Sequence, residues 1–331
     1  RRPQASSDER PPVSGLGRVA FLGTGPFGVP LLSRLADLAG ALLVVSQPDR
    51  PAGRGLQSRP SAIAAWAREH GLPVETPRRL RSDEGRRALA RFGPDGLLLV
   101  AYGQLVPDDV LALGERPPLN VHPSLLPRHR GAAPVASTIL AGDPTGGVSL
   151  MVMTPELDAG PIVGQWPVTL SGRETTPELE ARLAELTAQV VPPALVAWAD
   201  GTLDQEPQDP KLATLIRPFR RADGWLDWRK PAEQLDRQVR ALQPWPGAWT
   251  TVDGRRLHVR AAHPTAGVDG VPVGALLPGA WPEVATGQGA LALEMVQPEG
   301  KPAMPADAWR RGLGRDHVLL GAGGPEPERA G

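Results

Sequence analysis

The chain has 331 residues, of which 41% are hydrophobic and 22% charged, with zero formal net charge and no cysteine. Such a composition is typical of a globular protein in water, and the length allows a large domain and a smaller one. The lack of cysteine excludes disulfides, thiolate metal sites and a cysteine nucleophile. No apolar run approaches the roughly 20 residues of a membrane-spanning helix, so we expect a cytoplasmic protein without membrane contact.

The first part of the chain alternates short apolar segments with stretches of helical pattern. Residues 1–16 are rich in Arg, Pro and Ser, and we expect a disordered tail there. Residues 17–203 follow as one domain, with predicted strands at Val19–Leu22, Ala41–Val45, Gly96–Val100, Leu119–Val121 and Val148–Val152. Predicted helices lie at 27–39, 60–71, 84–92, 133–141 and 176–200, the last broken or bent at Pro192-Pro193. This alternation predicts a Rossmann-like α/β domain on a mostly parallel sheet.

After residue 203 the pattern changes. Residues 204–222 are polar and contain prolines, which is typical of a linker. Residues 223–315 are predicted to form a second domain, with a helix at 231–241 and then short strands. Asp253-Gly254 lies between two β-prone runs, as in a tight hairpin. These features predict a small OB-like β-barrel, and residues 316–331 are predicted to form a disordered tail.

Positive charge is concentrated in one part of this neutral chain. Between residues 211 and 260 there are eleven Lys and Arg against five Asp and Glu. A local basic excess predicts an anionic partner, whereas the alternative is a set of solvated loop charges that bind nothing.

The segment FLGTGPFGVP, residues 21–30, contains the G-x-G-x-x-G spacing of a dinucleotide-binding turn. Such a site also needs an acidic residue at the end of the second strand, where it holds the ribose hydroxyls. Here the second strand runs into Ser46-Gln47-Pro48, and Asp49 lies beyond the proline. We therefore interpret the glycines as a tight strand-to-helix turn and expect no NAD. A nucleotide-dependent oxidoreductase is the remote alternative.

The stretch LNVHPSLLPRHRGAAPV, residues 119–135, carries the candidate catalytic residues. Asn120 and His122 are two apart at the end of a strand, so both side chains point to one face. Asp158 follows the next predicted strand, where it can hydrogen-bond His122, hold its tautomer and raise its pKa. An amide beside an imidazole can stabilise an oxyanion and move protons. In the competing interpretation these residues only cap turns and end a strand.

The motif contains no serine or cysteine in the position of a nucleophile, so we expect the substrate to bring its own. A metal site is disfavoured, because His122 and His129 lie seven apart in a proline-bearing loop without recognised ligand spacing. We expect no metal.

The same segments resemble the tRNA branch of the 10-formyltetrahydrofolate-dependent formyltransferase superfamily, from about Val19 to about Gly312. The resemblance rests on QPDRPAGRG (47–55), VAYGQLVP (100–107), NVHPSLLPRHRGAAPV (120–135), LDAGPI (157–162), DW (227–228) and PWPGAW (244–249). It implies transfer of a formyl group from 10-formyltetrahydrofolate to the α-amine of methionine on initiator methionyl-tRNA, during translation initiation. Asn120 and His122 would stabilise the oxyanion of the tetrahedral intermediate, and Asp158 would orient and polarise His122.

The resemblance also implies the binding residues. The folate site would be lined by Ser124, Leu125, Leu126 and Pro127. Arg54, with Arg50 as a second candidate, would contact tRNA, and Phe27 would lie near the methionyl side chain or simply in the core. The basic segment and the β domain would bind tRNA phosphates, and a monomer is expected.

Three departures from the family pattern concern mainly the tRNA contacts. Leu56-Gln57-Ser58 stands where bacterial members often carry lysines, residues 216–221 differ from the usual lysine-bearing linker, and Pro123 replaces a glycine common in some members. The runner-up is a sugar-nucleotide formyltransferase of the same superfamily. That class usually has a second arginine at the position of Ala132 and has no reason for the Arg54 loop.

Overall fold

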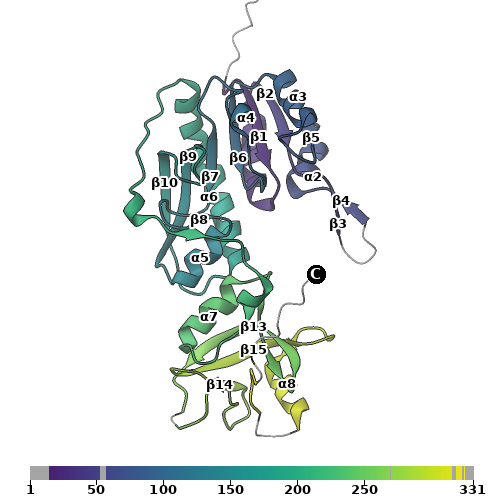
Figure 1. Ribbon diagram of the computed structural model, residues 1–331, viewed down its shortest axis with the longest axis vertical. Helices are drawn as coiled ribbons and strands as arrows, with labels where there is room; N and C mark the ends of the chain where they lie inside the picture. Colours follow the sequence, from purple (N-terminus) through teal and green to yellow (C-terminus); the bar gives the residue numbers. More distant parts are fainter. Residues whose placement is uncertain (1–14, 53–56, 269, 315–317, 323, 325–331) are drawn as a thin grey trace, which may run out of the picture. The chain divides into compact units, whose positions relative to one another are not determined.

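The computed structural model describes residues 15–52, 57–268, 270–314, 318–322 and 324 (Figure 1). The chain divides into two compact units. Unit 1 consists of Arg1–Arg130, Gly147–Pro167 and Ala181–Thr214, and unit 2 of Gly131–Gly146, Val168–Glu180 and Leu215–Gly331. Within the described ranges, no helix is both long and apolar enough to cross a membrane.

The N-terminal part is organised by a seven-stranded sheet of order β10-β9-β7-β6-β1-β2-β5 (Figure 1). Its strands are β1 (Arg18–Gly23), β2 (Ala41–Val45), β5 (Val74–Glu75), β6 (Gly96–Val100), β7 (Leu119–His122), β9 (Thr145–Val152) and β10 (Ile162–Thr169). The ladders from β5 through β2, β1 and β6 to β7 are parallel, whereas β9 runs antiparallel to β7. The prediction of a mostly parallel sheet is confirmed.

The centre of this sheet is buried on both faces, which explains its continuous apolar strands. Every residue of β6 is buried. A side chain at Gly96 would place its Cβ 2.1 Å from the indole of Trp198, so the strand can approach α6 (Thr176–Ala199) only as glycine. The helix is not broken at Pro192-Pro193, because α6 continues through both prolines, and the alternative of a bend there stays a prediction.

Helices alternate with the strands as predicted. They are α1 (Val29–Leu38), α2 (Ala62–Glu69), α3 (Asp83–Phe92), α4 (Asp108–Leu111) and α5 (Pro134–Ala141). The hydroxyl of Ser61 caps α2 by accepting from the amide of Ala64, and Ser82 caps α3 in the same way through Gly85. The glycine-rich segment forms a 3₁₀ turn, η1 (Pro26–Gly28), between β1 and α1, as the strand-to-helix interpretation requires.

Unit 2 contains an antiparallel sheet in the order β12-β13-β15-β14, with β16 paired to β15. Its elements are α7 (Ala232–Ala241), β12 (Ala248–Val252), β13 (Arg255–Thr265), β14 (Glu283–Ala285), β15 (Ala290–Pro298), β16 (Met304–Pro305) and α8 (Ala306–Leu313). Asp253 and Gly254 join β12 to β13 with φ of 51° and 73°, the backbone that a tight hairpin turn needs. The described strands form an antiparallel sheet domain, and an OB-like barrel is not confirmed.

The core of unit 2 contains side chains from its helices, from its sheet and from the last part of the described chain. Leu235 and Val239 of α7 are fully buried against Val259 of β13 and Leu291 of β15. Val318 and Leu320 belong to the same core and are 5% and 2% exposed. They lie in the stretch for which the sequence predicted a disordered tail, and they pack because their own apolar side chains complete this core.

Candidate active site

Hydrogen bonds to one backbone carbonyl group join the carboxyl ends of three parallel strands. Thr24, after β1, donates from its hydroxyl to the backbone oxygen of Tyr102 at 2.8 Å, and Gln47, after β2, donates to the same oxygen at 2.9 Å. Tyr102 itself follows β6. Three successive strand ends are therefore fixed beside β7, the strand that carries the candidate catalytic pair.

Asn120 and His122 occupy alternate positions on β7, so their side chains leave the same face of the sheet. Asn120 is half-buried and pairs in register with Leu99 of β6 and Met151 of β9. His122 is the last residue of the strand and is only 4% exposed. The strand thus holds an amide and an imidazole at the edge where ligands of open α/β sheets bind.

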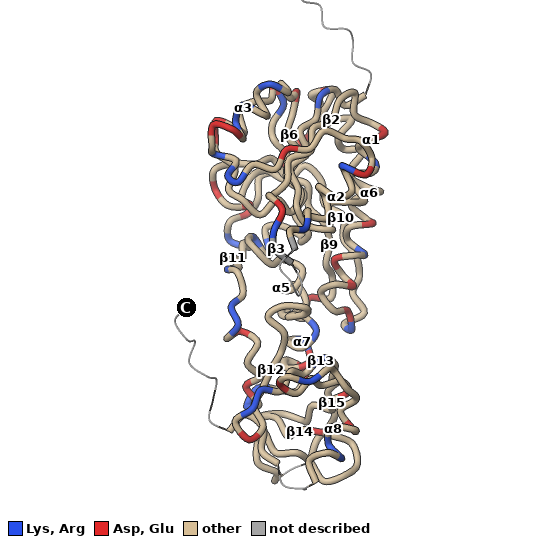
Figure 2. Tube along the Cα trace, turned by 90° about the vertical axis from the view of Figure 1, so that its right-hand side faces the viewer, with Lys and Arg blue, Asp and Glu red and all other residues tan. Residues whose placement is uncertain are grey.

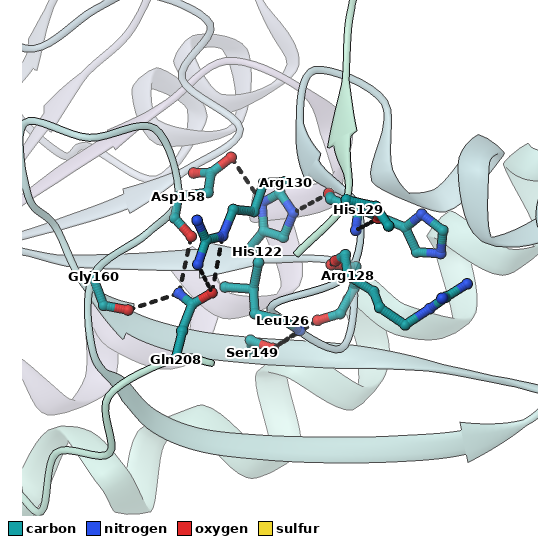
Figure 3. Close-up of polar contacts among 11 residues, drawn as sticks. His122, Leu126, Arg128, His129, Arg130, Ser149, Asp158, Gly160 and Gln208 are labelled. Atoms are coloured by element: carbon teal, nitrogen blue, oxygen red, sulfur yellow. Dashed lines mark hydrogen bonds and ion pairs between the residues drawn. The ribbon is translucent and has the colours of Figure 1, made fainter. Parts of the chain in front are cut away.

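The ring of His122 lies between two oxygen atoms, as Figure 3 shows. Its Nε2 is 2.9 Å from the backbone oxygen of His129, and its Nδ1 is 3.7 Å from Oδ2 of Asp158. A carbonyl oxygen can only accept, so Nε2 carries the hydrogen and Nδ1 of a neutral ring turns its lone pair to the carboxylate. The two oxygen atoms therefore favour a second proton, on Nδ1.

Burial and charge act on His122 in opposite directions. Burial is the largest effect and lowers the pKa of His122 below its usual 6.5, while the Asp158 carboxylate and the hydrogen bond to His129 raise it. The side chains of His122 and Asp158 are 5% and 12% exposed. Asp158 thus raises the pKa of His122 as predicted, but desolvation of the ring exceeds the attraction of the carboxylate and the net pKa is lowered.

The loop after His122 is held by hydrogen bonds from two neighbouring strands. Ser124 donates from its amide to the His122 carbonyl at 2.9 Å. The amide of Leu126 donates to the hydroxyl of Ser149, on β9, at 3.0 Å. Gln165, on β10, donates to the Leu126 carbonyl at 2.8 Å. Ser124 and Leu126 are buried, so this part of the predicted folate loop has a fixed backbone.

The other two residues of that loop are Leu125 and Pro127. Leu125 is held by close packing, and Pro127 by a hydrogen bond from the chain that follows α6. Leu125 lies against Gly147 of β9, where a Cβ would fall 2.5 Å from a Leu125 methyl. The carbonyl of Pro127 accepts from the amide of Thr214 at 3.3 Å. All four predicted folate residues are thus parts of one anchored turn beside His122.

Asp158 lies in a turn whose backbone is unusually constrained. Its φ is 49°, in the left-handed region. A Cβ at Gly160 would lie 1.8 Å from the backbone oxygen of Val152, so the turn packs on β9 only with glycine. The side-chain amide of Gln208 donates to the carbonyls of Asp158 and Gly160 at 2.9 and 2.7 Å. The buried Arg130 donates in turn to Oε1 of Gln208.

Sequence analysis did not identify Gln208 or Arg130. Gln208 lies in the predicted linker, and no local pattern connects it with a turn fifty residues earlier in the chain. Arg130 stands two residues after the exposed Arg128, and the sequence alone does not show that one of these arginines is buried and the other is not.

The predicted tRNA-contact residues are only partly visible. Arg54 lies outside the described residues. Arg50 begins β3 (Arg50–Ala52), which pairs with β4 (Gln57–Arg59), and its guanidinium donates to the side-chain oxygen of Gln47. Phe27 lies in η1 and is 8% exposed. In the part of the chain that is described, no cluster of three His, Asp or Glu side chains could hold a metal ion.

Comparison with known proteins defines the class. The sequence pattern of the formyl transferase family matches residues 17–195, and that of the formyl transferase C-terminal domain matches residues 219–314. Two curated relatives are named methionyl-tRNA formyltransferase. The protein from Roseiflexus sp. (strain RS-1) is 43% identical over 89% of this chain and 92% of its own length, and that from Paracoccus denitrificans is 40% identical over 89% and 97%. The chain therefore belongs to the methionyl-tRNA formyltransferase family.

Solved structures support the same fold at lower identity. HypX from Aquifex aeolicus in complex with tetrahydrofolic acid is 19% identical with a TM-score of 0.59, covering 88% of this chain and 46% of that protein. WlaRD, a sugar 3N-formyl transferase, is 13% identical with a TM-score of 0.64 over 87% of this chain and 99% of its own. At these identities the likeness establishes a shared fold and no shared substrate.

Proposed function

We propose that the protein transfers the formyl group of 10-formyltetrahydrofolate to the α-amine of methionine on initiator methionyl-tRNA. The observation that carries the proposal is the His122 ring between the Asp158 carboxylate and the His129 carbonyl, at the end of β7. In a member of this family, such a ring is suited to a reaction that creates and removes one negative charge. A monomeric, cytoplasmic enzyme stays a prediction from the sequence.

The reaction needs charge stabilisation and proton movement, and it needs no enzyme nucleophile. The methionyl amine attacks the formyl carbon, and the carbonyl electron pair moves to oxygen. The amide of Asn120 donates to that oxyanion, and His122, protonated at Nδ1, stabilises the same charge. Collapse of the intermediate breaks the bond to N10 of the folate, which takes up the proton that the amine has lost. The products are formyl-methionyl-tRNA and tetrahydrofolate.

The anchored turn of residues 124–127 supplies the folate site in this proposal. Its hydrogen bonds to Ser149 and Gln165 fix the backbone before ligand arrives. Preorganised main-chain groups bind a flat, polar ring with little loss of entropy. The turn also adjoins His122 directly, through the hydrogen bond from the amide of Ser124, which supports a position of the formyl donor beside the catalytic pair.

Unit 2 offers a basic strand for RNA phosphates. Arg256, His258 and Arg260 alternate along β13 and are half-buried, whereas the residues between them are buried in the core. Arg256 lies over the ring of Trp249, with 4.4 Å from its guanidinium carbon to the ring centroid. Figure 2 marks the Lys and Arg positions of the described chain in blue. Two arginines that alternate on one strand suit contact with RNA phosphates, and the buried Trp249 ring supports the guanidinium of Arg256.

The proposal is tested by supplying the purified protein with 10-formyltetrahydrofolate and charged initiator or elongator tRNA, side by side. Formylation of the initiator methionyl-tRNA is expected. His122→Ala should lower turnover by roughly 100-fold or more while binding of tRNA is retained. No formylation of tRNA, together with formylation of an amino-sugar nucleotide, would transfer the assignment to the sugar-nucleotide class. Arg54→Ala should weaken use of tRNA without changing the folate KM.

A further inference from the structure

Gln208 contacts the backbone on which Asp158 is carried. Both hydrogens of its amide are used, one on the Asp158 carbonyl at 2.9 Å and one on the Gly160 carbonyl at 2.7 Å (Figure 3). Its neighbours Pro207 and Asp209 are exposed, whereas Gln208 is half-buried. The side chain is therefore turned inward from a polar surface segment to reach this one turn.

Arg130 fixes the orientation of the Gln208 amide. Its Nε and Nη2 donate to Oε1 of Gln208 at 3.0 and 2.8 Å. Since a guanidinium has no acceptor, Oε1 must face Arg130 and the amide nitrogen must face the turn. The Arg130 side chain is only 6% exposed, and its third nitrogen lies 3.9 Å from the solvent-exposed Glu156.

The same stretch of chain also supports the other side of the His122 ring. Thr214 accepts from the amide of His129 through its hydroxyl, at 2.8 Å, and from the amide of Arg130 through its carbonyl, at 2.9 Å. The His129 carbonyl is the group that binds Nε2 of His122. Residues 206–214 thus bond both groups that flank the ring. Gln208 bonds the turn of Asp158, and Thr214 bonds His129, whose carbonyl oxygen binds Nε2 of His122.

We propose that Gln208, oriented by Arg130, is a positioning residue that holds the Asp158 carboxylate at its place beside Nδ1 of His122. Asp158 has a left-handed backbone conformation, and hydrogen bonds from outside its turn stabilise that shape. Gln208 supplies two of those bonds. The inference rests on the proposed function only in treating His122 and Asp158 as the catalytic pair.

The experiment follows the ring nitrogens of His122 by ¹⁵N NMR in the full-length protein, between pH 4.5 and 8, without substrate. Gln208→Met keeps the length of the side chain and removes both donors, and Gln208→Ala serves as a second variant. We expect the Nδ1 resonance to change and the pKa of His122 to fall by roughly half a unit, because a more distant carboxylate attracts the proton less. His129 is the other titratable group that faces the ring, and its own resonances are followed in the same spectra.

Gln238→Met is the matched control. The Gln238 amide also donates to two backbone carbonyls spaced two residues apart, those of Asp223 and Trp225, at 2.8 and 2.9 Å. Loss of that amide should lower thermal stability and leave the His122 resonances unchanged. An equal change of the His122 resonances in Gln208→Met and Gln238→Met overturns the inference. So does the absence of any change in the two Gln208 variants.

Kinetics give an independent arm. In the wild-type background, Gln208→Met should lower kcat about tenfold with KM for folate little changed, because the catalytic pair is displaced while the folate turn is kept. In an Asp158→Asn background the same change should lower kcat less than twofold. If Gln208→Met lowers kcat by the same factor in the wild-type and the Asp158→Asn backgrounds, Gln208 does not act through Asp158. Absence of formylation by the unmodified protein would refute the proposed function, whereas the NMR result would still stand by itself.

Discussion

Replacing Asp158 by Asn isolates the charge of the catalytic pair. The two side chains have the same shape, so the change removes a negative charge 3.7 Å from Nδ1 of His122. At that separation and an effective dielectric constant of about 20, two unit charges attract by roughly 4 kcal/mol, or about three pKa units at most. Measured carboxylate–cation pairs give about one to three units. We expect the pKa of His122 to fall by one to three units.

The same substitution should lower kcat by roughly 10- to 1000-fold, the factor that corresponds to this loss of proton affinity. Its amide can also donate to Nδ1, which stabilises the neutral ring and opposes the uptake of a proton on Nδ1 during the proposed reaction. Steady-state formylation of methionyl-tRNA measures kcat, and ¹⁵N NMR of the histidine rings measures the pKa. An unchanged or raised pKa of His122, or an unchanged kcat in a folded variant, would refute the reasoning.

Three further predictions concern stability and RNA binding. Gly160→Ala should destabilise the protein by about 3 kcal/mol in urea unfolding, because its Cβ would meet a backbone oxygen, whereas Gly25→Ala, which meets nothing within 4 Å, should change stability by less than about 0.5 kcal/mol. Burial lowers the pKa values of His122 and His258 below 6.5, so the unfolded chain protonates first and thermal stability should fall as the pH is lowered through 6.5. His258→Gln should reduce that fall, and an identical dependence on pH would contradict the assignment. Arg256→Ala should raise KM for methionyl-tRNA and reduce the slope of log KM against log salt by about one, and a salt slope equal to that of the unmodified protein would exclude this phosphate contact.

The sequence predicted the parts of the fold that follow from local pattern. The apolar strands β1, β2 and β6 lie where their continuous hydrophobic runs indicated, because a strand buried on both faces leaves such a run. The hairpin at Asp253-Gly254 followed from turn chemistry alone. Asn120 and His122 were placed on one face by the period of a strand, and their position at the sheet edge followed from topology.

The features that escaped prediction depend on contacts between distant residues. The helix α6 passes through two prolines because it is held by packing along its length, including Trp198 against Gly96. Gln208 gains its importance from hydrogen bonds to residues about fifty and seventy-eight positions earlier in the chain. The raising effect of Asp158 on the pKa of His122 was predicted, whereas the larger lowering effect of burial was not, since the sequence does not show how deeply the ring is buried.

The lowered net pKa of His122 fits the proposed reaction. A ring that is neutral in the resting enzyme can accept the proton that the attacking amine loses, which a ring already charged cannot do. Burial keeps His122 neutral at first, and the attacking amine then releases a proton as negative charge grows on the formyl oxygen. The proton becomes stable on Nδ1 when that oxyanion adds its attraction to that of Asp158, 3.7 Å away. The interaction is then stronger in the transition state than in the ground state, which is the condition for a higher kcat.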